Sequence, residues 1–383
     1  MLLLLMLIAA AIAYFIQMII FEKNYDKGIA SKVEFEVPYV EQGGFGSIKE
    51  VIENKKWLPL PVVHMSFRTG KGIQFGTLEN ISVSDTVTRR DVFSLLWHQR
   101  ITRTFNFRGE QRGHYYIKSA DVNVYNLLMT DKYYLQFPQN TELYVYPKSL
   151  DTERLNLLME RIFGFLQSTQ RFYDDPLSFA GIREYAPGDE MKRINWKASA
   201  RERELMVNVF DSVMAQKVMI FLDVSDKGIW KQQELAEEGI CIVASICKRL
   251  LNAGAKVALY SNGYLGNTGK TLEISYETDN QKIHTINRTL CDLKLSIETE
   301  TPAEMFSRAM EREENVGSIF LLVSKNVEEG YGKEMKQCVT SKVTGRGNVS
   351  CMHIIPCHRS LTGDKMELEN VEGVQQILWE VEA

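Results

Sequence analysis

The first residues of the chain impose the strongest constraint on its fold. The run MLLLLMLIAAAIAYFIQMIIF, Met1 to Phe21, has no charged side chain, and Gln17 is its one strongly polar residue. A helix of this length is long enough to cross a bilayer, which needs about 20 apolar residues. A secretory signal peptide would carry a basic segment before a shorter apolar stretch, and this run has neither. We therefore predict a transmembrane helix at residues 1–21.

The charges that flank this helix predict its orientation. Lys23, Lys27 and Lys32 follow the apolar run, and no basic residue precedes it. The positive-inside rule then predicts that the helix is anchored in the cell membrane with the soluble domains in the cytoplasm. The 6 cysteines all lie in the C-terminal part without a C-x-x-C pair, which favours free thiols in a reducing compartment and leaves a disulfide open.

Composition excludes one class of partner. The chain has 383 residues, 45% of them hydrophobic, and a net charge of -4, which describes a protein of more than one globular domain. It contains no basic stripe with interleaved aromatic residues, so a nucleic-acid partner is not expected.

Period-two alternation predicts an all-β domain at residues 22–150. Segments 33–37, 60–67, 101–107 and 143–146 alternate apolar and polar side chains, and glycine-containing turns at 43–44, 70–72 and 112–113 separate them. Short strands at such spacing are typical of an immunoglobulin-like antiparallel sandwich. His114, a lone histidine beside aromatic residues, is expected to be a strand residue, because a metal site needs several ligands.

Helical and parallel-strand patterns follow. Apolar residues recur at three- and four-residue intervals between 151 and 172, which predicts an amphipathic connecting helix. The apolar run 218–222 is typical of a central parallel strand, and a helix over 231–252 with Gly254 as its cap follows it. Further apolar strands at 257–260, 318–323 and 349–355 predict a doubly wound α/β sheet in a domain at 215–383.

A linking region at residues 151–214 contains the connecting helix and, after it, a densely charged segment. This segment reads SFAGIREYAPGDEMKRINWKASARERELMVNVFD, residues 178–211, and its acidic and basic side chains are equal in number. We predict a turn at 186–189, a short helix that begins near Asp189, and a strand at 205–210. Because the charges balance, ion pairs among Arg183, Asp189 and Arg193 are expected to hold the turn; a docking surface for a partner is the functional alternative.

This segment resembles the signature of the bacterial DUF58 family, whose C-terminal part looks like a von Willebrand factor A domain. The resemblance implies a membrane-tethered protein that accompanies a MoxR-type AAA+ ATPase and a transglutaminase-like membrane protein. Relatives look as if they carry two N-terminal spans, so the number of spans in a longer precursor stays open. The residues that match the signature, and are candidates for partner docking, are Arg183, Tyr185, Gly188, Asp189, Arg193, Trp196 and Arg201.

A second resemblance concerns a metal. Residues 223–227, Asp-Val-Ser-Asp-Lys, resemble the D-x-S-x-S loop with which von Willebrand A domains hold Mg²⁺. The resemblance implies Asp223, Ser225 and Thr301 as candidate ligands. Lys227 replaces the second serine, however, and an ammonium offers no lone pair to a cation. Thr301 also begins a capping box with Glu304, which explains this threonine without a metal.

No motif predicts an enzyme. The chain has no G-x-S-x-G elbow, H-E-x-x-H helix or phosphate loop, and Lys325 is expected to be a solvated surface residue. We therefore expect a membrane-anchored, non-enzymatic adaptor of the DUF58 kind that works in complex assembly or cell-envelope physiology. Two alternatives stay open: a Mg²⁺-dependent ligand-binding A domain, and an unrecognised envelope hydrolase with a nucleophile and a base in one pocket.

Overall fold

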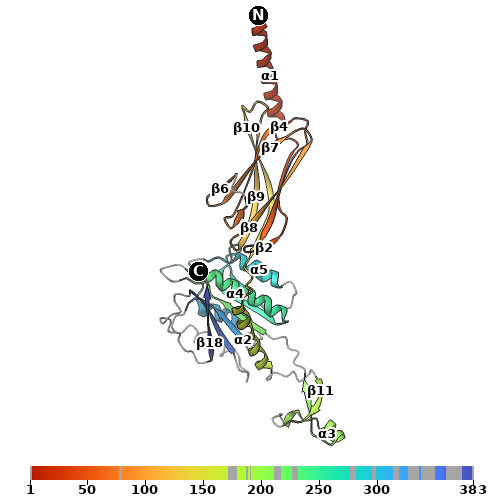
Figure 1. Ribbon diagram of the computed structural model, residues 1–383, viewed down its shortest axis with the longest axis vertical. Coiled ribbons are helices and arrows are strands. Elements are labelled where there is room, and N and C mark those ends of the chain that lie inside the picture. Colours follow the sequence, from red (N-terminus) through yellow and green to blue (C-terminus); the bar gives the residue numbers. More distant parts are fainter. Residues whose placement is uncertain are drawn as a thin grey trace. The chain divides into compact units, whose positions relative to one another are not determined.

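The architecture is that of a computed structural model, drawn in Figure 1 with its helices and strands labelled. It describes residues 2–76, 80–170, 179–186, 189, 191–210, 217–226, 232–276, 282–295, 299–313, 319–326, 336–337, 350–358 and 373–381. The chain divides into two compact units. Residues 1–148 with 290–292 form the first, and residues 149–289 with 293–383 form the second.

The first helix, α1 (Leu2–Asn24), is the apolar helix that the sequence predicts. Its residues 4–24 are long and apolar enough to cross a membrane, with a mean hydropathy of 2.5, and 6% of this stretch is buried by other parts of the chain. A helix with these properties serves either as a membrane span or as a signal sequence. Its last turn is different, because Phe21 is fully buried among the residues of the domain that follows.

Two β-sheets build that domain. One has four strands in the order β1-β3-β8-β5, and the other has six in the order β2-β10-β9-β4-β7-β6. Neighbouring strands run antiparallel, except that β2 pairs in parallel with β10. The strands are β1 (Ile29–Phe35), β2 (Tyr39–Glu41), β3 (Phe45–Asn54), β4 (Leu60–Thr69), β5 (Ile73–Phe75), β6 (Ile81–Val83), β7 (Val87–Leu95), β8 (Gln99–Gly109), β9 (Gly113–Tyr125) and β10 (Lys132–Tyr146).

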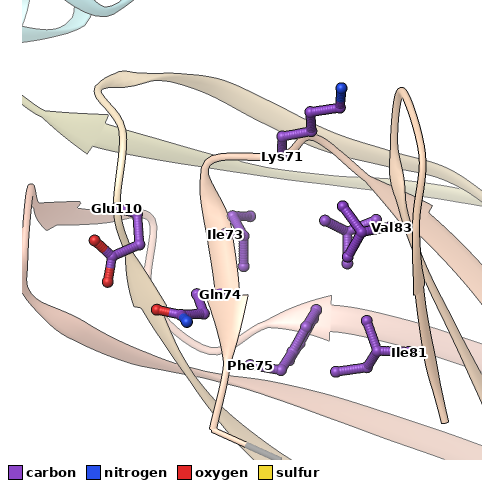
Figure 2. Close-up of a pocket in the computed structure, with 8 residues that line it drawn as sticks. Lys71, Ile73, Gln74, Phe75, Ile81, Val83 and Glu110 are labelled. Carbon is purple, nitrogen blue, oxygen red and sulfur yellow. The ribbon is translucent and has the colours of Figure 1, made fainter. Parts of the chain in front are cut away.

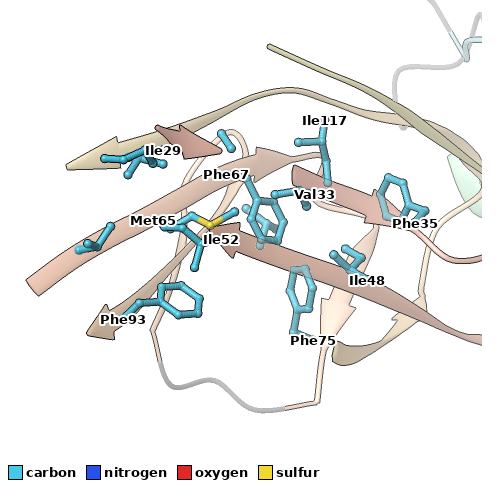
Figure 3. Packing of buried hydrophobic residues seen from close by; sticks show 14 of the residues in the cluster. Ile29, Val33, Phe35, Ile48, Ile52, Met65, Phe67, Phe75, Phe93 and Ile117 are labelled. Atoms are coloured by element: carbon cyan, nitrogen blue, oxygen red, sulfur yellow. The ribbon is translucent and has the colours of Figure 1, made fainter. Parts of the chain in front are cut away.

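Both sheets contribute to one apolar core, part of which Figure 3 shows. Val33 and Ile48 come from the four-stranded sheet, and Phe67 and Phe93 come from the six-stranded sheet; all four are at most 2% exposed. The alternation that predicted the strands appears as burial in β7, where every second residue is buried. The domain is therefore a β-sandwich, and its immunoglobulin-like kinship stays a prediction.

Two long strands of the sandwich exceed the sequence prediction. β10 begins at Lys132 instead of residue 143, and β9 continues to Tyr125, whereas the sequence predicted a strand residue in this stretch at His114 alone. The first half of β10 alternates half-buried and exposed side chains and contains Pro138, beside which the register with β9 shifts. Proline has no backbone N–H to donate to a neighbouring strand, so a proline in the sequence argues against a strand at that position. For this reason the sequence pattern did not predict the first half of β10.

The second unit opens with the predicted connecting helix, α2 (Glu153–Gln170). Its apolar stripe is buried, as the spacing predicted: Leu155, Leu158, Met159, Ile162 and Leu166 are all at most 3% exposed. The side chain of Phe165, which belongs to the same predicted stripe, lies outside the described residues.

A six-stranded sheet forms the body of the second unit, in the order β15-β14-β13-β16-β17-β18. Five of these strands run parallel, and the edge strand β15 runs antiparallel to β14. The strands are β13 (Lys217–Leu222), β14 (Lys256–Tyr264), β15 (Thr271–Ile274), β16 (Ile319–Val323), β17 (Ser350–His358) and β18 (Val374–Val381). The predicted parallel strands are thus present, and the von Willebrand A-like character of this domain stays a prediction.

Helices cover both faces of this sheet. α6 (Pro302–Arg312) shares an apolar core with Phe221 and Phe320, whereas Gly239 of α4 (Gln233–Asn252) lies against Leu222 and Val323. Because successive strand residues point to opposite faces, α4 and α6 lie on opposite sides. Gly254 adopts a φ of 80° after α4, in the capping position that the sequence predicted. A further helix, α5 (Lys282–Asp292), follows β15 in the chain.

Candidate functional site

The strongest cluster of buried polar side chains surrounds Asp223, at the carboxyl end of β13. Parallel strands bring their carboxyl ends to one edge of a sheet, and this edge is where open α/β sheets bind ligands. Asp223, Ser225, Asn262 of β14 and Ser324 after β16 are each at most 3% exposed. Three neighbouring strands therefore supply the cluster.

The Asp223 carboxylate accepts five hydrogen bonds within the cluster. Its Oδ1 accepts from the Ser225 backbone N–H at 2.9 Å, the Ser225 hydroxyl at 2.6 Å and the Asn262 amide at 2.5 Å. Its Oδ2 accepts from the Ser324 hydroxyl and from the Asn326 amide, both at 2.7 Å. The charge is therefore compensated by donors of the protein itself.

Two asparagines tie the loops of the cluster together. The Asn262 side chain also accepts from the Val224 backbone N–H at 2.9 Å, so that it bridges the loop after β13 and strand β14. The Asn326 amide also donates to the Ser225 hydroxyl at 2.9 Å, and this links the loops after β13 and β16. Sequence patterns predicted Asp223 and Ser225 as members of the site, but not Asn262, Ser324 and Asn326. All three of these residues come just after predicted apolar strands, and this position could have indicated that they lie at the same edge of the sheet as Asp223.

A buried histidine and an ion pair adjoin the cluster. His353, in β17, is 2% exposed, and burial lowers the pKa of its imidazole to about 4, although Ser324 and Asp223 oppose the shift. Lys325 donates to Asp226 at 2.7 Å, and its side chain is 4% exposed. The expectation that Lys325 is a solvated surface residue is therefore wrong, because pairing with Asp226 allows its ammonium to be buried.

The cluster does not suit a magnesium ion. Both oxygens of Asp223 already accept from amide and hydroxyl groups, and amide N–H groups in such positions repel a cation. Thr301 caps α6 in the predicted capping box with Glu304, and the described hydrogen bonds do not join its side chain to Asp223. The described residues contain no group of three or more His, Cys, Asp or Glu side chains arranged for a metal. Lys227, the other departure from the motif, lies outside the described residues.

The charged segment forms a small hairpin module of its own. Strands β11 (Phe179–Glu184) and β12 (Met206–Phe210) pair antiparallel, and the 3₁₀ turn η1 (Met191–Arg193) and helix α3 (Trp196–Glu202) connect them. The cap of α3 is Asn195, whose side chain accepts from the Ala198 N–H at 3.0 Å. The prediction that a helix begins near Asp189 is thus too early in the chain, because the amide side chain that accepts from the first turn belongs to Asn195.

One predicted ion pair holds the turn of this module. The Arg183 guanidinium donates to both carboxylate oxygens of Asp189, at 2.7 and 2.6 Å, and Asp189 also accepts from the Ala186 N–H at 2.8 Å. The pKa of Arg183 is raised by this contact. Gly188 and the side chain of Arg193, which the sequence grouped with this pair, lie outside the described residues. Tyr185 is half-buried and Arg201 is exposed.

Large apolar side chains are exposed on the same module. Trp196 is 66% exposed and Met191 is 69% exposed, and Ile182 and Leu205 are 42% and 46% exposed. Ile194 and Val207, which pair in an isolated β-bridge, are buried instead. Trp196 therefore lies on the surface of the module and is not one of its core residues.

The sandwich has a pocket of its own, shown in Figure 2. It has a volume of about 390 Å³, and apolar side chains such as Ile73, Phe75 and Ile81 line it. Its charged lining residues are Lys71, which pairs with Asp85 at 3.5 Å, and Glu110. The residues that line this pocket include no serine, threonine, cysteine or histidine, which are the usual nucleophiles and bases of covalent hydrolysis.

The chain thus combines an apolar N-terminal helix, a β-sandwich and a mainly parallel α/β sheet. Residues 181–345 match the family model described as "Protein of unknown function DUF58". This range contains most of the hairpin module and the whole Asp223 cluster. A curated relative, the uncharacterized protein YeaD of Bacillus subtilis (strain 168), is 24% identical over 224 residues, which cover 55% of this chain. Those residues are 50% of YeaD, so the chain spans about half the length of that relative.

Similarity to solved structures is partial. The CARDB domain of a Pyrococcus furiosus protein is 15% identical, with 31% of this chain and 96% of that chain covered and a TM-score of 0.19. A non-cellulosomal cohesin from Archaeoglobus fulgidus is 9% identical, with 33% and 96% covered and a TM-score of 0.21. Similarity at this level does not bear on function.

Proposed function

We propose that this protein is a membrane-anchored, non-enzymatic adaptor of the DUF58 kind. In this proposal α1 crosses the cell membrane, the soluble domains lie in the cytoplasm, and the α/β sheet is von Willebrand factor A-like. Its partner is a MoxR-type AAA+ ATPase, with a transglutaminase-like membrane protein as a second partner, in complex assembly or cell-envelope physiology. The observation that carries the proposal is the set of exposed apolar side chains on the hairpin module, within the segment that matches the family.

The chemistry of the module suits a protein partner. Protein interfaces are enriched in tryptophan, methionine and arginine, and their binding energy is concentrated in a few such anchors. Trp196 and Met191 are both exposed here, and Arg183 is held in a fixed orientation by Asp189. A turn whose polar groups are already paired loses little conformational freedom when a partner binds.

The Asp223 cluster supports binding rather than catalysis. Its carboxylate is saturated with hydrogen bonds, and burial keeps His353 neutral at neutral pH. A general base needs a free lone pair within reach of a substrate proton, and the Asp223 carboxylate accepts from five donors already. We infer that the cluster fixes the loops at the carboxyl edge of the sheet, and so shapes a surface there.

Replacing the exposed anchors should weaken capture of the ATPase and leave folding intact. We expect Trp196→Ser and Met191→Ser to reduce, by tenfold or more, the AAA+ ATPase recovered with the tagged full-length protein from gently solubilised membranes, with and without ATP. Phe45→Ser is the matched control, because Phe45 is 76% exposed but lies in the sandwich. Equal recovery with all variants, or recovery of no ATPase in either condition, would contradict the adaptor role.

A second candidate function, Mg²⁺-dependent ligand binding, is favoured by one observation: Asp223 and Ser225 do lie together at a strand end. Because their lone pairs are engaged, we expect millimolar Mg²⁺ to leave the melting temperature of the protein unchanged. Differential scanning calorimetry with Mg²⁺ or with a chelator measures this. A Mg²⁺-dependent rise that disappears in Asp223→Ala would establish the metal-binding alternative instead.

A further inference from the structure

The end of the sandwich at which α1 enters carries three exposed apolar turns. The turn between β3 and β4 presents Trp57, which is 64% exposed, and the turn between β7 and β8 presents Leu96 and Trp97, at 56% and 61%. The turn between β9 and β10 presents Leu127, Leu128 and Met129, at 42%, 58% and 57%. Below, these turns are called the apolar tips.

Hydrogen bonds tie the first two tips to the end of α1. The Lys56 ammonium donates to the carbonyls of Asn24 and Tyr25, at 2.7 and 2.8 Å. The His98 backbone N–H donates to the Lys56 carbonyl at 3.2 Å, and the Asn54 amide donates to the Leu96 carbonyl at 2.9 Å. The tips that carry Trp57 and Trp97 are therefore neighbours of the last turn of α1.

Aromatic stacking brings the third tip to the same place. The ring of Tyr133, at the base of the β9–β10 turn, stacks on Tyr25 with centroids 4.5 Å apart and lies 5.7 Å from the ring of Phe21. The Asn126 side chain accepts from the Thr130 backbone N–H at 2.8 Å and closes the turn. This fixed turn keeps its leucine and methionine side chains outside the core.

No flexible linker separates α1 from the sandwich. Ile19 is 50% exposed, but Ile20 packs against the sandwich core and Phe21 is fully buried in it. At 1.5 Å of rise per residue, the distance from Ile19 to Asn24 along the helix is about 8 Å. Figure 1 shows α1 leading directly into this end of the sandwich. If a bilayer surrounds the apolar side chains of α1 up to Ile19, its surface must therefore meet the sandwich at this end.

We propose that the apolar tips insert into the interfacial zone of the same bilayer that α1 crosses. Tryptophan prefers this zone because its ring is apolar and its N–H is polar, and exposed Lys23, Lys27 and Lys55 lie in the same turns or beside them, where anionic headgroups attract them. The occupant is thus the lipid surface, because the tips continue an apolar surface that α1 already presents. The inference rests on the membrane span in the proposed function.

Quenching of tryptophan by brominated lipids tests this inference. Full-length protein is reconstituted in phosphatidylcholine and phosphatidylglycerol vesicles, with acyl chains that are either brominated or not. We expect bromine to quench the wild-type fluorescence, and the quenched fraction to fall several-fold when Trp57→Phe and Trp97→Phe are combined. Both residues are exposed, so phenylalanine at these positions should leave the fold unchanged.

The matched control moves the probe to the other end of the same strand. Phe45 and Asn54 are the two ends of β3, so a tryptophan at position 45 lies roughly 30 Å from the Trp57 turn. Phe45→Trp, added to the double variant, should not restore the quenching. Restored quenching would show that the probe does not report depth, and would overturn the assignment of the tips.

Flotation of the same vesicles separates the two ways in which the inference can fail. If the protein floats with the vesicles but bromine quenches the wild type no more than the double variant, the tips do not enter the bilayer, and the anchor in the proposed function survives. If the protein fails to float, α1 is not a membrane anchor, and both proposals are overturned together.

Discussion

Replacing Glu50 by glutamine is expected to abolish the largest pH-dependent contribution to the stability of the sandwich that the structure indicates. Glu50 lies in the middle of β3, directly opposite Arg103 of β8, and its side chain is fully buried. Within the described part of the chain neither of its carboxylate oxygens has a hydrogen-bond partner. Burial raises the pKa of the Glu50 carboxyl to about 8, the Asp91 carboxylate adds to the rise, and Arg89 and Arg103 oppose it.

The neighbouring charges explain why Glu50 is the group that takes up a proton. Arg89 holds Asp91 in a buried bidentate ion pair, with distances of 2.7 and 3.2 Å from Nε and Nη2 to the carboxylate oxygens. Arg103 lies 4.0 Å from the same carboxylate. Asp91 thus takes the nearest positive charge, and a second ionised carboxylate beside it would be poorly compensated.

The sign of the effect follows from proton linkage. In the unfolded chain Glu50 ionises near pH 4.5, whereas in the folded protein it stays protonated up to about pH 8. The folded state therefore binds one more proton between these values, so this contribution is fully present below pH 4.5 and is lost as pH rises through 8. The loss amounts to about 5 kcal/mol, since one pKa unit is worth about 1.4 kcal/mol and the pKa of Glu50 rises from 4.5 to about 8.

Urea unfolding of the wild type and of Glu50→Gln, measured in parallel from pH 4.5 to pH 8.5, tests this expectation. The difference in unfolding free energy between the two proteins should grow with pH in favour of the glutamine variant. Glu53→Gln, on the same strand, is the control for the loss of a carboxylate from β3. Parallel pH profiles of wild type and Glu50→Gln would contradict the prediction.

Removal of the Asp223 carboxylate should have the second large effect. Asp223→Ala removes the acceptor of five hydrogen-bond donors. They are the Ser225 backbone N–H, the Ser225 hydroxyl, the Asn262 amide, the Ser324 hydroxyl and the Asn326 amide. A buried donor that loses its partner costs about 1–3 kcal/mol, and neighbouring groups relax in part. We expect a loss of on the order of 4 kcal/mol in the free energy of unfolding.

The asparagine variant makes this prediction specific to the hydrogen bonds. Asp223→Asn keeps the shape of the side chain but turns one acceptor into a donor, so it should also be strongly destabilising. Glu234→Ala, which removes an exposed carboxylate at the start of α4, should change stability little. If Asp223→Ala unfolds in the same range of denaturant as Glu234→Ala, the cluster does not hold the edge of the sheet.

The hairpin module shows how far local sequence reaches. The balanced charges of residues 178–211 predicted ion pairing, and Arg183 and Asp189 do pair across the turn, because they are close in sequence and a turn brings them together. The same local reasoning placed the start of the helix at Asp189, although Asn195 caps it. Aspartate and asparagine are both good N-cap residues, so residue type does not decide between Asp189 and Asn195. The pairing of β11 with β12 decides which of the two lies at the first turn of α3.

Long-range partners explain the residues that the sequence analysis missed. Asn262, Ser324 and Asn326 act through Asp223, which lies 39 to 103 residues away along the chain. A single polar residue after an apolar strand has many uses, and its partner becomes visible only when the parallel strands align their carboxyl ends. Lys325 was assigned to the surface for the same reason, since nothing local to it announces Asp226.

By itself the sequence determined the apolar N-terminal helix, the alternation of the sandwich strands, the amphipathic face of α2 and the apolar parallel strands of the α/β sheet. These features follow from hydrophobic periodicity within a single element, which is a local property of the chain. Only the tertiary structure decided that Glu50 is buried beside Asp91, that five donors surround Asp223, and that Trp57, Trp97 and Leu128 gather at the end of α1. Each of these three features forms where elements that are far apart in sequence meet in space. The burial and the neighbouring charges that result from this packing determine the chemistry of the residues.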